Sequence, residues 1–334
     1  MLSDYIAARE TARSIGAPIM TYIFIVSLII AALSVFYLTK RDEKFGKYLK
    51  RLIYIDTLLF VLGFLALIWF HLKIYQTVVI EYPEFLRYYL PVTQARFAVP
   101  LWIENEKMYF WTMCISLFTS FVSFKYGCSR EKPILPFLGI MLALFGIIIF
   151  FFTNPFDHPL PIVDREISSW YAALASGHPD IIAQTSMQLY GRITYYYNST
   201  YMWTHPPMLF IAYASLAVTF AACVLMLFNG SRELDKIAYS YAKVGYIFLT
   251  AGMLIGYPWA VEAWKDQPWW WDPKINGAIM MWLLYSAYLH TRIYIRKGRM
   301  WHTTALIGIG CFVSLIFTYL LTYLMPGIHS VVQP

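Results

Sequence analysis

Half of the tryptophans in this 334-residue chain fall in one stretch of 24 residues, 259–282, and this crowding exceeds what the stability of a fold requires. Indole rings suit the interface between lipid and water, so one interpretation is an aromatic anchor for a loop. A second interpretation is a binding surface, because three consecutive tryptophans and a fourth five residues earlier are more than an anchor needs. The cluster consists of Trp259, Trp264, Trp269, Trp270, Trp271 and Trp282.

Such a surface suits a large, flat, mostly apolar ring that has one polar edge and a metal in need of axial nitrogen ligands. Haem has these properties: its face stacks on indoles, imidazole is a common ligand of its iron, and its propionates can reach Lys265 or Lys274. From the residues alone, a haem site stands beside two alternatives, the aromatic anchor and a quinone site. The candidates to hold the ring are Trp264, Trp269, Trp270, Trp271 and Trp282.

Two of the seven histidines are candidates for the axial nitrogens, because each borders an apolar run on the same predicted side as the tryptophan stretch. His205 directly precedes one run, in WTHPPMLF, and His329 follows another, in MPGIHS. His290 is different, because it lies 14 residues beyond Asn276, which is about 21 Å along a helix that rises about 1.5 Å per residue. An ionisable group at that depth in a membrane is costly, so His290 is a candidate for a separate functional role.

The other polar residues of interest have plainer interpretations. His71 is expected to be a hydrogen-bonded histidine near the outer end of its helix. Asp272 precedes Pro273, and this pair favours a turn and an N-cap for the next helix rather than a role in proton transfer. Three further histidines are expected to be solvated loop residues, namely His158, His178 and His302.

The composition places these residues in a membrane. Of the chain, 59% is hydrophobic and 13% charged, against roughly 25% charged in soluble domains, which excludes a soluble globular enzyme. Apolar runs of about twenty residues recur from end to end, and each is long enough to cross the hydrocarbon as a helix. We therefore predict an all-α, polytopic transmembrane helical bundle that forms a single integral membrane domain over 1–334. The eight predicted spans are 17–39, 52–75, 108–124, 133–153, 207–228, 244–261, 277–295 and 303–324.

Charge patterning orients this bundle. Fifteen of the 26 Lys and Arg residues fall in four short connections, and the positive-inside rule places these on the cytoplasmic face and both termini on the outer face. The outer face then holds the tryptophan stretch and a long loop at 154–206. The basic clusters are membrane anchors and indicate no nucleic-acid partner. The four cysteines form no C-x-x-C or C-x-x-C-H motif, and the N-terminus does not look like a cleavable signal. The basic connections are 40–51, 125–132, 229–243 and 296–302.

The sequence WWWDPKINGAIMMWLLYSAYLHTR resembles the WWD signature of the haem-handling proteins of cytochrome c biogenesis, in particular the CcsA (ResC) type, which is related to CcmF and CcmC. That pattern runs W-x-W-D-P-K-E, then a Trp, then Y-L-H-T-R, and it departs here at Ile275, where the family has Glu. His205, in HPPMLFIAY, and His329, in GIHS, resemble the two outer histidines of the family. The resemblance is specific over 205–329, which is thus a WWD-type haem-handling region, and only topological before it. The matching residues are Trp269, Trp271, Asp272, Pro273, Lys274, Trp282, Tyr288, Leu289, His290, Thr291 and Arg292.

The resemblance implies a function, which is delivery of haem and its presentation for covalent attachment to apocytochrome c, as a system II-like component of a cytochrome c haem lyase (holocytochrome c synthase). It implies that His205 and His329 are axial ligands of haem b, held non-covalently in transit beside Asp272 and the tryptophans. It assigns His290 to a second haem site within the membrane. The implied partners are the lipid bilayer, apocytochrome c and a CcsB (ResB)-like membrane subunit. The implied location is a prokaryotic inner membrane or the thylakoid equivalent, with the tryptophan loop on the outer face.

Two other interpretations stay open at this point. The first is an electron-transfer membrane subunit with a permanent b-type haem or a quinone site. Against it stands the lack of two intramembrane histidines at matching depth, which a bis-histidine haem within the bilayer needs. The second is a haem-free scaffold in which tryptophans and histidines anchor loops.

Overall fold

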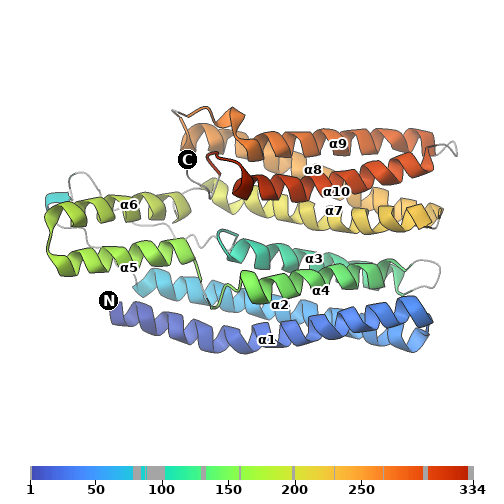
Figure 1. The fold of residues 1–334 in the computed structure, drawn as a ribbon, viewed down its shortest axis with the longest axis horizontal. Helices are drawn as coiled ribbons and strands as arrows, with labels where there is room; N and C mark the ends of the chain where they lie inside the picture. The colour runs from blue at the N-terminus through green and yellow to red at the C-terminus, as the bar shows by residue number, and fades with distance from the viewer. Residues whose placement is uncertain are drawn as a thin grey trace. The chain divides into compact units, whose positions relative to one another are not determined.

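In the structure, a computed structural model, the only regular secondary structure over the described residues is helical (Figure 1). These residues are 2–77, 84–86, 88, 102–128, 133–157, 159–197, 200–228, 230–265, 267–295 and 300–329. No strand occurs among them, which confirms the predicted all-α class. The α-helices are α1 (Leu2–Lys40), α2 (Glu43–Thr77), α3 (Glu106–Tyr126), α4 (Ile134–Phe152), α5 (Pro161–Ser176), α6 (Pro179–Tyr197), α7 (His205–Phe228), α8 (Arg232–Ala263), α9 (Pro273–Ile295) and α10 (Trp301–Leu324). Three short 3-10 helices are η1 (Glu84–Leu86), η2 (Thr200–Trp203) and η3 (Trp269–Trp271).

Each of the eight predicted spans coincides with a helix, namely one of α1 to α4 or α7 to α10. Within the described part of the chain, six of these helices are long and apolar enough to cross a membrane, and the chain is an integral membrane protein. The two others, α3 and α9, fall short because they carry several Ser, Thr, Tyr and Trp side chains, whose hydropathy is low, beside charged residues. The number of spans and the outer position of both termini therefore stay predictions.

The first helix is longer than the first predicted span. α1 begins at Leu2, although the span was expected to start at 17, because the polar N-terminal residues continue the same helix. This extension contacts α5: the Tyr5 hydroxyl donates to the Asp164 carboxylate at 2.5 Å, and the Arg9 guanidinium lies 2.8 Å from the same carboxylate. The polar start of α1 thus helps to hold the segment at 154–206.

The predicted outer loop at 154–206 folds largely into a helical hairpin, in which α5 and α6 lie side by side (Figure 1). The turn between them contains Gly177 at φ 69°, a left-handed conformation that glycine adopts without strain. The Trp170 indole N–H donates to the Ser186 hydroxyl at 3.1 Å, and the Arg192 guanidinium pairs with the Glu166 carboxylate at 2.9 Å. These contacts join the facing sides of the two helices.

The N-terminus of α5 is held by two carboxylates that precede or begin α3. Glu104 accepts a hydrogen bond from the N–H of Ile162 at 2.8 Å, and Glu106 accepts one from the N–H of Leu160 at 3.2 Å. The same Glu106 oxygen lies 3.1 Å from Nε2 of His71 on α2, and both side chains are fully buried. The hydrogen bond predicted for His71 is therefore present, and it connects α2, α3 and the start of α5. His158 lies outside the described residues.

The chain divides into two compact units. The first unit contains Met1–Ile30, Tyr54–Met113 and Leu142–Trp203, and the second contains Ala31–Ile53, Cys114–Met141 and Thr204–Pro334. The single integral membrane domain expected over 1–334 stays a prediction. The second unit contains all the predicted haem-binding residues.

Within the second unit, the last four helices pack on one another and run alongside each other in Figure 1. α7 contacts α8 and α10, while α9 contacts α8 and α10. The approach of α7 to α8 is close at Gly245, where a Cβ atom would lie 2.6 Å from the Leu216 side chain. The Ser215 hydroxyl on α7 also donates to the Tyr241 carbonyl on α8 at 2.7 Å. This packing brings the first turn of α7, where His205 stands, against the later turns of α8.

Candidate functional site

His205 is the first residue of α7, and its ring lies against α8. Its Nδ1 atom is 2.7 Å from the carbonyl oxygen of Gly252. Because a carbonyl only accepts, Nδ1 of the neutral ring carries the proton and Nε2 presents its lone pair. Nε2 forms no hydrogen bond with the residues that the structure describes. Gly256 makes room for the ring, since a Cβ atom there would lie 2.6 Å from the ring carbon Cε1.

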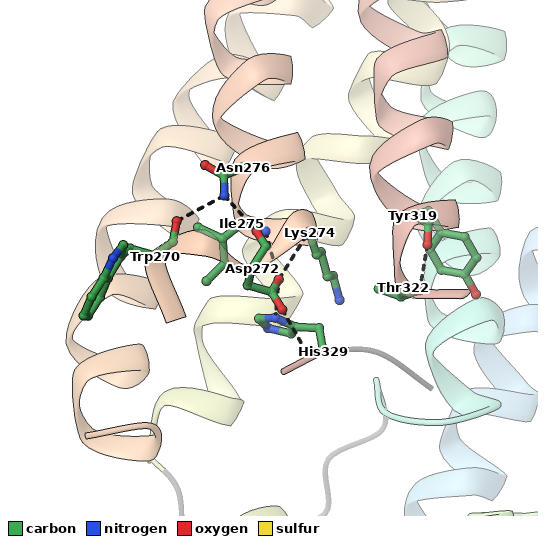
Figure 2. A network of polar contacts seen from close by, with 8 residues as sticks. All are labelled: Trp270, Asp272, Lys274, Ile275, Asn276, Tyr319, Thr322 and His329. Carbon is green, nitrogen blue, oxygen red and sulfur yellow. Dashed lines mark hydrogen bonds and ion pairs between the residues drawn. The ribbon is translucent and has the colours of Figure 1, made fainter. Parts of the chain in front are cut away.

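His329 follows α10 and is held at two points by Asp272 (Figure 2). Its backbone N–H donates to Oδ2 of Asp272 at 3.1 Å, and its Nδ1 atom lies 3.0 Å from Oδ1. Burial lowers the pKa of His329 below its ordinary value, and the hydrogen bond to Asp272 offsets this only in part. The ring is therefore neutral at neutral pH and donates from Nδ1. Its Nε2 atom, like that of His205, has no hydrogen-bond partner in the described part of the chain.

Asp272 also caps α9. Its Oδ1 atom accepts hydrogen bonds from the backbone N–H groups of Lys274 at 3.0 Å and Ile275 at 3.2 Å, which confirms the predicted N-cap (Figure 2). Burial raises the pKa of Asp272, but the hydrogen bonds from His329 and Ile275 outweigh burial and hold the pKa well below its ordinary value. Asp272 is therefore an ionised carboxylate that one helix N-terminus and one histidine share.

Two tryptophans connect the two histidines. The ring of His205 lies 5.4 Å from that of Trp259, measured between centroids, and Trp259 lies 5.1 Å from Trp264. Trp264 in turn meets the ring of His329 edge to face at 4.8 Å. The structure thus brings His205 and His329, which are 124 residues apart in the sequence, to the two ends of one aromatic bridge.

The three consecutive tryptophans form the short helix η3, directly before α9. Trp269 is half-buried and packs edge to face against Tyr257 at 5.4 Å between centroids. Trp270 and Trp271 are exposed, at 53% and 75% of their surface. The side-chain amide of Asn276 donates to the carbonyls of Trp270 and Asp272, both at 3.1 Å, and so fixes the turn (Figure 2). The turn therefore presents two indoles at the surface of the second unit.

Two predicted site residues lie away from this cluster. Trp282, well along α9, donates from its indole N–H to the Thr250 hydroxyl at 2.9 Å and stacks on Tyr246 at 5.7 Å between ring centroids. His290 lies two turns further on, with Nδ1 at 2.8 Å from the carbonyl of Ser286 and its side chain exposed. The structure therefore joins Trp282 to α8 and does not place it beside η3.

Sequence reasoning does not single out two residues that contact His205, namely Gly252 and Gly256, and it places Trp259 in the tryptophan cluster without assigning it to the site. A signal for the two glycines exists in the sequence. They stand four residues apart, so they share one face of α8, and small residues at this spacing mark a close approach in membrane helices. The contact with Trp259 depends on the rotation of α8 about its axis, which the sequence pattern leaves open.

A family model described as cytochrome C assembly protein matches residues 102–329. The chain belongs to this family. The cytochrome C assembly match includes both histidines, Asp272 and the tryptophan stretch. It also begins about a hundred residues before the WWD-type region at 205–329, so the family resemblance reaches further towards the N-terminus than the motifs alone predict.

Curated relatives of this cytochrome C assembly chain are similar over a shorter range. The cytochrome c biogenesis protein CcsA of Prochlorococcus marinus strain MIT 9312 is 42% identical over 105 residues, which are 31% of this chain and 33% of that protein. The CcsA protein of strain NATL2A is 39% identical over 105 residues, 31% of this chain and 32% of its own length. The chain thus matches about a third of the length of these relatives. A solved structure of the cytochrome c haem lyase CcmF has the same fold, with a TM-score of 0.66 at 19% identity, over 92% of this chain and 47% of that one.

Proposed function

We propose that this chain binds haem b non-covalently on the outer face of a membrane and presents it to apocytochrome c for covalent attachment. The observation that supports this most directly is the state of His205 and His329. Each Nδ1 atom donates a hydrogen bond to an acceptor, so each Nε2 atom is available to bind a metal. A histidine that ligates a metal through one ring nitrogen usually donates a hydrogen bond from the other ring nitrogen, and this hydrogen bond orients the ring. In this proposal the chain acts with a CcsB (ResB)-like subunit as a component of a cytochrome c haem lyase.

The residues around the two histidines fit a haem. No group of three or more His, Cys, Asp or Glu side chains that could hold a bare metal ion occurs in the described part of the chain. Two nitrogens are too few for a bare ion, but they are the number that an iron already held by four ring nitrogens needs. Trp259 and Trp264 supply aromatic surface between the histidines, and Gly256 lacks the Cβ atom that would displace the His205 ring.

When bound, haem supplies the iron and the two vinyl groups to which the thiols of the acceptor add. The residues of this chain hold and orient the haem but supply no nucleophile, because the nucleophilic thiols belong to apocytochrome c. His205 and His329 fix the position of the iron, and Trp264, Trp269, Trp270 and Trp271 support the ring. The exposed indoles of η3 offer an apolar surface next to the site.

His290 has a separate role in this proposal, as a ligand at a second haem site nearer the cytoplasmic face. Its ring is exposed on the surface of α9, and the bond from Nδ1 to the Ser286 carbonyl again leaves Nε2 without a partner among the described residues. A partner subunit would supply the ligand on the opposite side of the iron.

In this proposal the membrane is a prokaryotic inner membrane or the thylakoid equivalent, with the WWD loop on its outer face.

Absorption spectra of the purified protein test the proposal. We expect a low-spin haem with two histidine ligands, which acid–organic solvent extracts unmodified. After addition of the partner subunit and a reduced peptide that contains C-x-x-C-H, the haem should resist extraction because it has become covalently attached. In His290→Ala, the spectrum of the outer haem should persist while the yield of attached haem falls. A haem that stays extractable and is cycled reversibly by a quinol would instead support an electron-transfer subunit, and a protein without haem absorbance would support a scaffold.

Gly256→Ala is expected to reduce haem retention, because the new Cβ atom would lie 2.6 Å from Cε1 and 2.7 Å from Nδ1 of His205 and must push the ring aside. A displaced ligand should lower haem affinity by about tenfold, the low end of what changes near a metal ligand cost. The measurement is haem per polypeptide after purification. Gly310→Ala is the matched control, since its Cβ atom would meet nothing within 4 Å. Equal haem contents in the two variants would contradict the role of His205.

A further inference from the structure

The rings of His205 and His329 are bonded to acceptors of different kinds. Nδ1 of His329 donates to the Asp272 carboxylate at 3.0 Å, whereas Nδ1 of His205 donates to the backbone carbonyl of Gly252 at 2.7 Å. Gly252 lies inside α8, where a carbonyl also accepts the helical hydrogen bond from the residue four positions on. One ring therefore faces a full negative charge, and the other faces a neutral carbonyl that already has a donor.

This difference bears on the strength of each nitrogen as a metal ligand. Hydrogen bonds to an ionised group are about twice as strong as bonds between neutral groups. A carboxylate that accepts the Nδ1 proton also raises the basicity of the nitrogen that binds the metal. Asp272 keeps its charge because the backbone N–H groups of Lys274, Ile275 and His329 all donate to it. Nε2 of His329 is therefore the stronger donor of the two.

The two histidines also differ in how firmly they are held. His329 is bonded to Asp272 through both its backbone and its ring, and the segment around it packs so closely that a Cβ atom on Gly327 would lie 2.7 Å from Oδ2 of Asp272. The His205 ring is held by one hydrogen bond and by ring contact with Trp259. Rotation about the side-chain bonds of His205 breaks only that one bond.

We infer that His329 is the axial ligand that stays with the haem iron, and that His205 is the ligand exchanged for an imidazole of the acceptor protein. This inference rests on the proposed function and deepens it. In the exchange, one iron–nitrogen bond to His205 breaks and one iron–nitrogen bond to the incoming imidazole forms, with no net transfer of a proton or an electron. Asp272 is the positioning residue that makes the two ligands unequal.

A cycle of variants measured by haem titration tests the inference. His205→Ala leaves His329 as the single ligand, and His329→Ala leaves His205. We expect haem to bind about tenfold more tightly to His205→Ala. Adding Asp272→Asn to His205→Ala should remove most of this advantage and raise the reduction potential of the bound haem, because the amide carries no charge. Adding Asp272→Asn to His329→Ala should leave the affinity and the potential nearly unchanged.

The cycle separates the effect on the ligand from an effect on the turn. Asparagine retains an oxygen that can cap α9, and Glu262→Gln, which neutralises an exposed carboxylate of α8, is the control for loss of charge alone. An equal loss of affinity from Asp272→Asn in both backgrounds would mean that Asp272 only shapes the turn, and it would overturn the inference. Equal affinities of the two single-histidine proteins would do the same. Failure of the proposed function looks different, because then the parent protein either binds no haem or keeps its haem extractable in the presence of the partner subunit and the C-x-x-C-H peptide.

Discussion

Haem content is expected to fall to near zero when His205 and His329 are both replaced by alanine, and to fall strongly in each single variant. The two residues offer the only pair of unpartnered imidazole nitrogens that the structure, over the residues it describes, places at the ends of the Trp259–Trp264 bridge. Loss of an outer-shell partner alone costs about 10- to 100-fold in metal affinity, so loss of the ligand itself should cost more. The measurement is the haem absorbance per polypeptide of protein purified without added haem.

Added imidazole should restore part of the haem in each single variant, because a free imidazole can occupy the position that the side chain leaves. His178→Ala and His302→Ala are suitable controls, since both histidines are exposed and lie outside the aromatic bridge. If neither His205→Ala nor His329→Ala changed the haem content, both would be excluded as axial ligands.

A large loss of stability is expected from Asp235→Ala, which removes one partner of a buried ion pair. The Asp235 carboxylate on the first turn of α8 accepts a hydrogen bond from the Arg292 guanidinium near the end of α9, and both side chains are more than 90% buried. The guanidinium also lies 4.5 Å from the centre of the Tyr239 ring. Removing one partner of such a pair costs about 3–5 kcal/mol, because the remaining charge stays buried. The midpoint of thermal unfolding in detergent measures the effect.

The double variant Asp235→Leu/Arg292→Met should recover much of this loss, since apolar residues of similar volume often replace a buried pair at little cost. Lys236→Ala, at an exposed position on the same turn of α8, is the control and should change the midpoint little. A double variant that is no more stable than Asp235→Ala would contradict this account of the pair. The ion pair fixes the end of α9 only two residues from His290, so its loss should also disturb that histidine.

The common location of His205, His329 and the tryptophan stretch could be predicted from the sequence, because the predicted membrane topology puts all three on the same side. The sequence also predicts the N-cap at Asp272, since Asp before Pro in the turn leaves few alternatives. The partners of the two histidine rings could not be predicted in this way. The contact of His205 with Gly252 depends on the packing of α7 on α8, and the bond from His329 to Asp272 depends on the path of the chain after α10.

Two other contacts could not be predicted from the sequence, for a related reason. Trp282 belongs to the same sequence cluster as Trp271, but ten further residues of helix carry it about 15 Å along α9, where it meets Thr250 instead. Asp235 resembles any acidic residue of a basic connection, and its pairing with Arg292 follows only from the antiparallel approach of α8 and α9. Periodicity and charge locate a residue along its own helix, whereas these contacts depend on the facing helix.

The bridge from His205 through Trp259 and Trp264 to His329 also gives the chain an optical property. Indole fluorescence is lost by energy transfer to a strongly absorbing porphyrin bound nearby, and half of the twelve indoles lie in one stretch of 24 residues. Binding of haem at the bridge would therefore quench a large share of the tryptophan fluorescence of the protein. Transfer of the haem to an acceptor protein would restore the fluorescence. Tryptophan fluorescence would therefore report each turnover in real time without an added label.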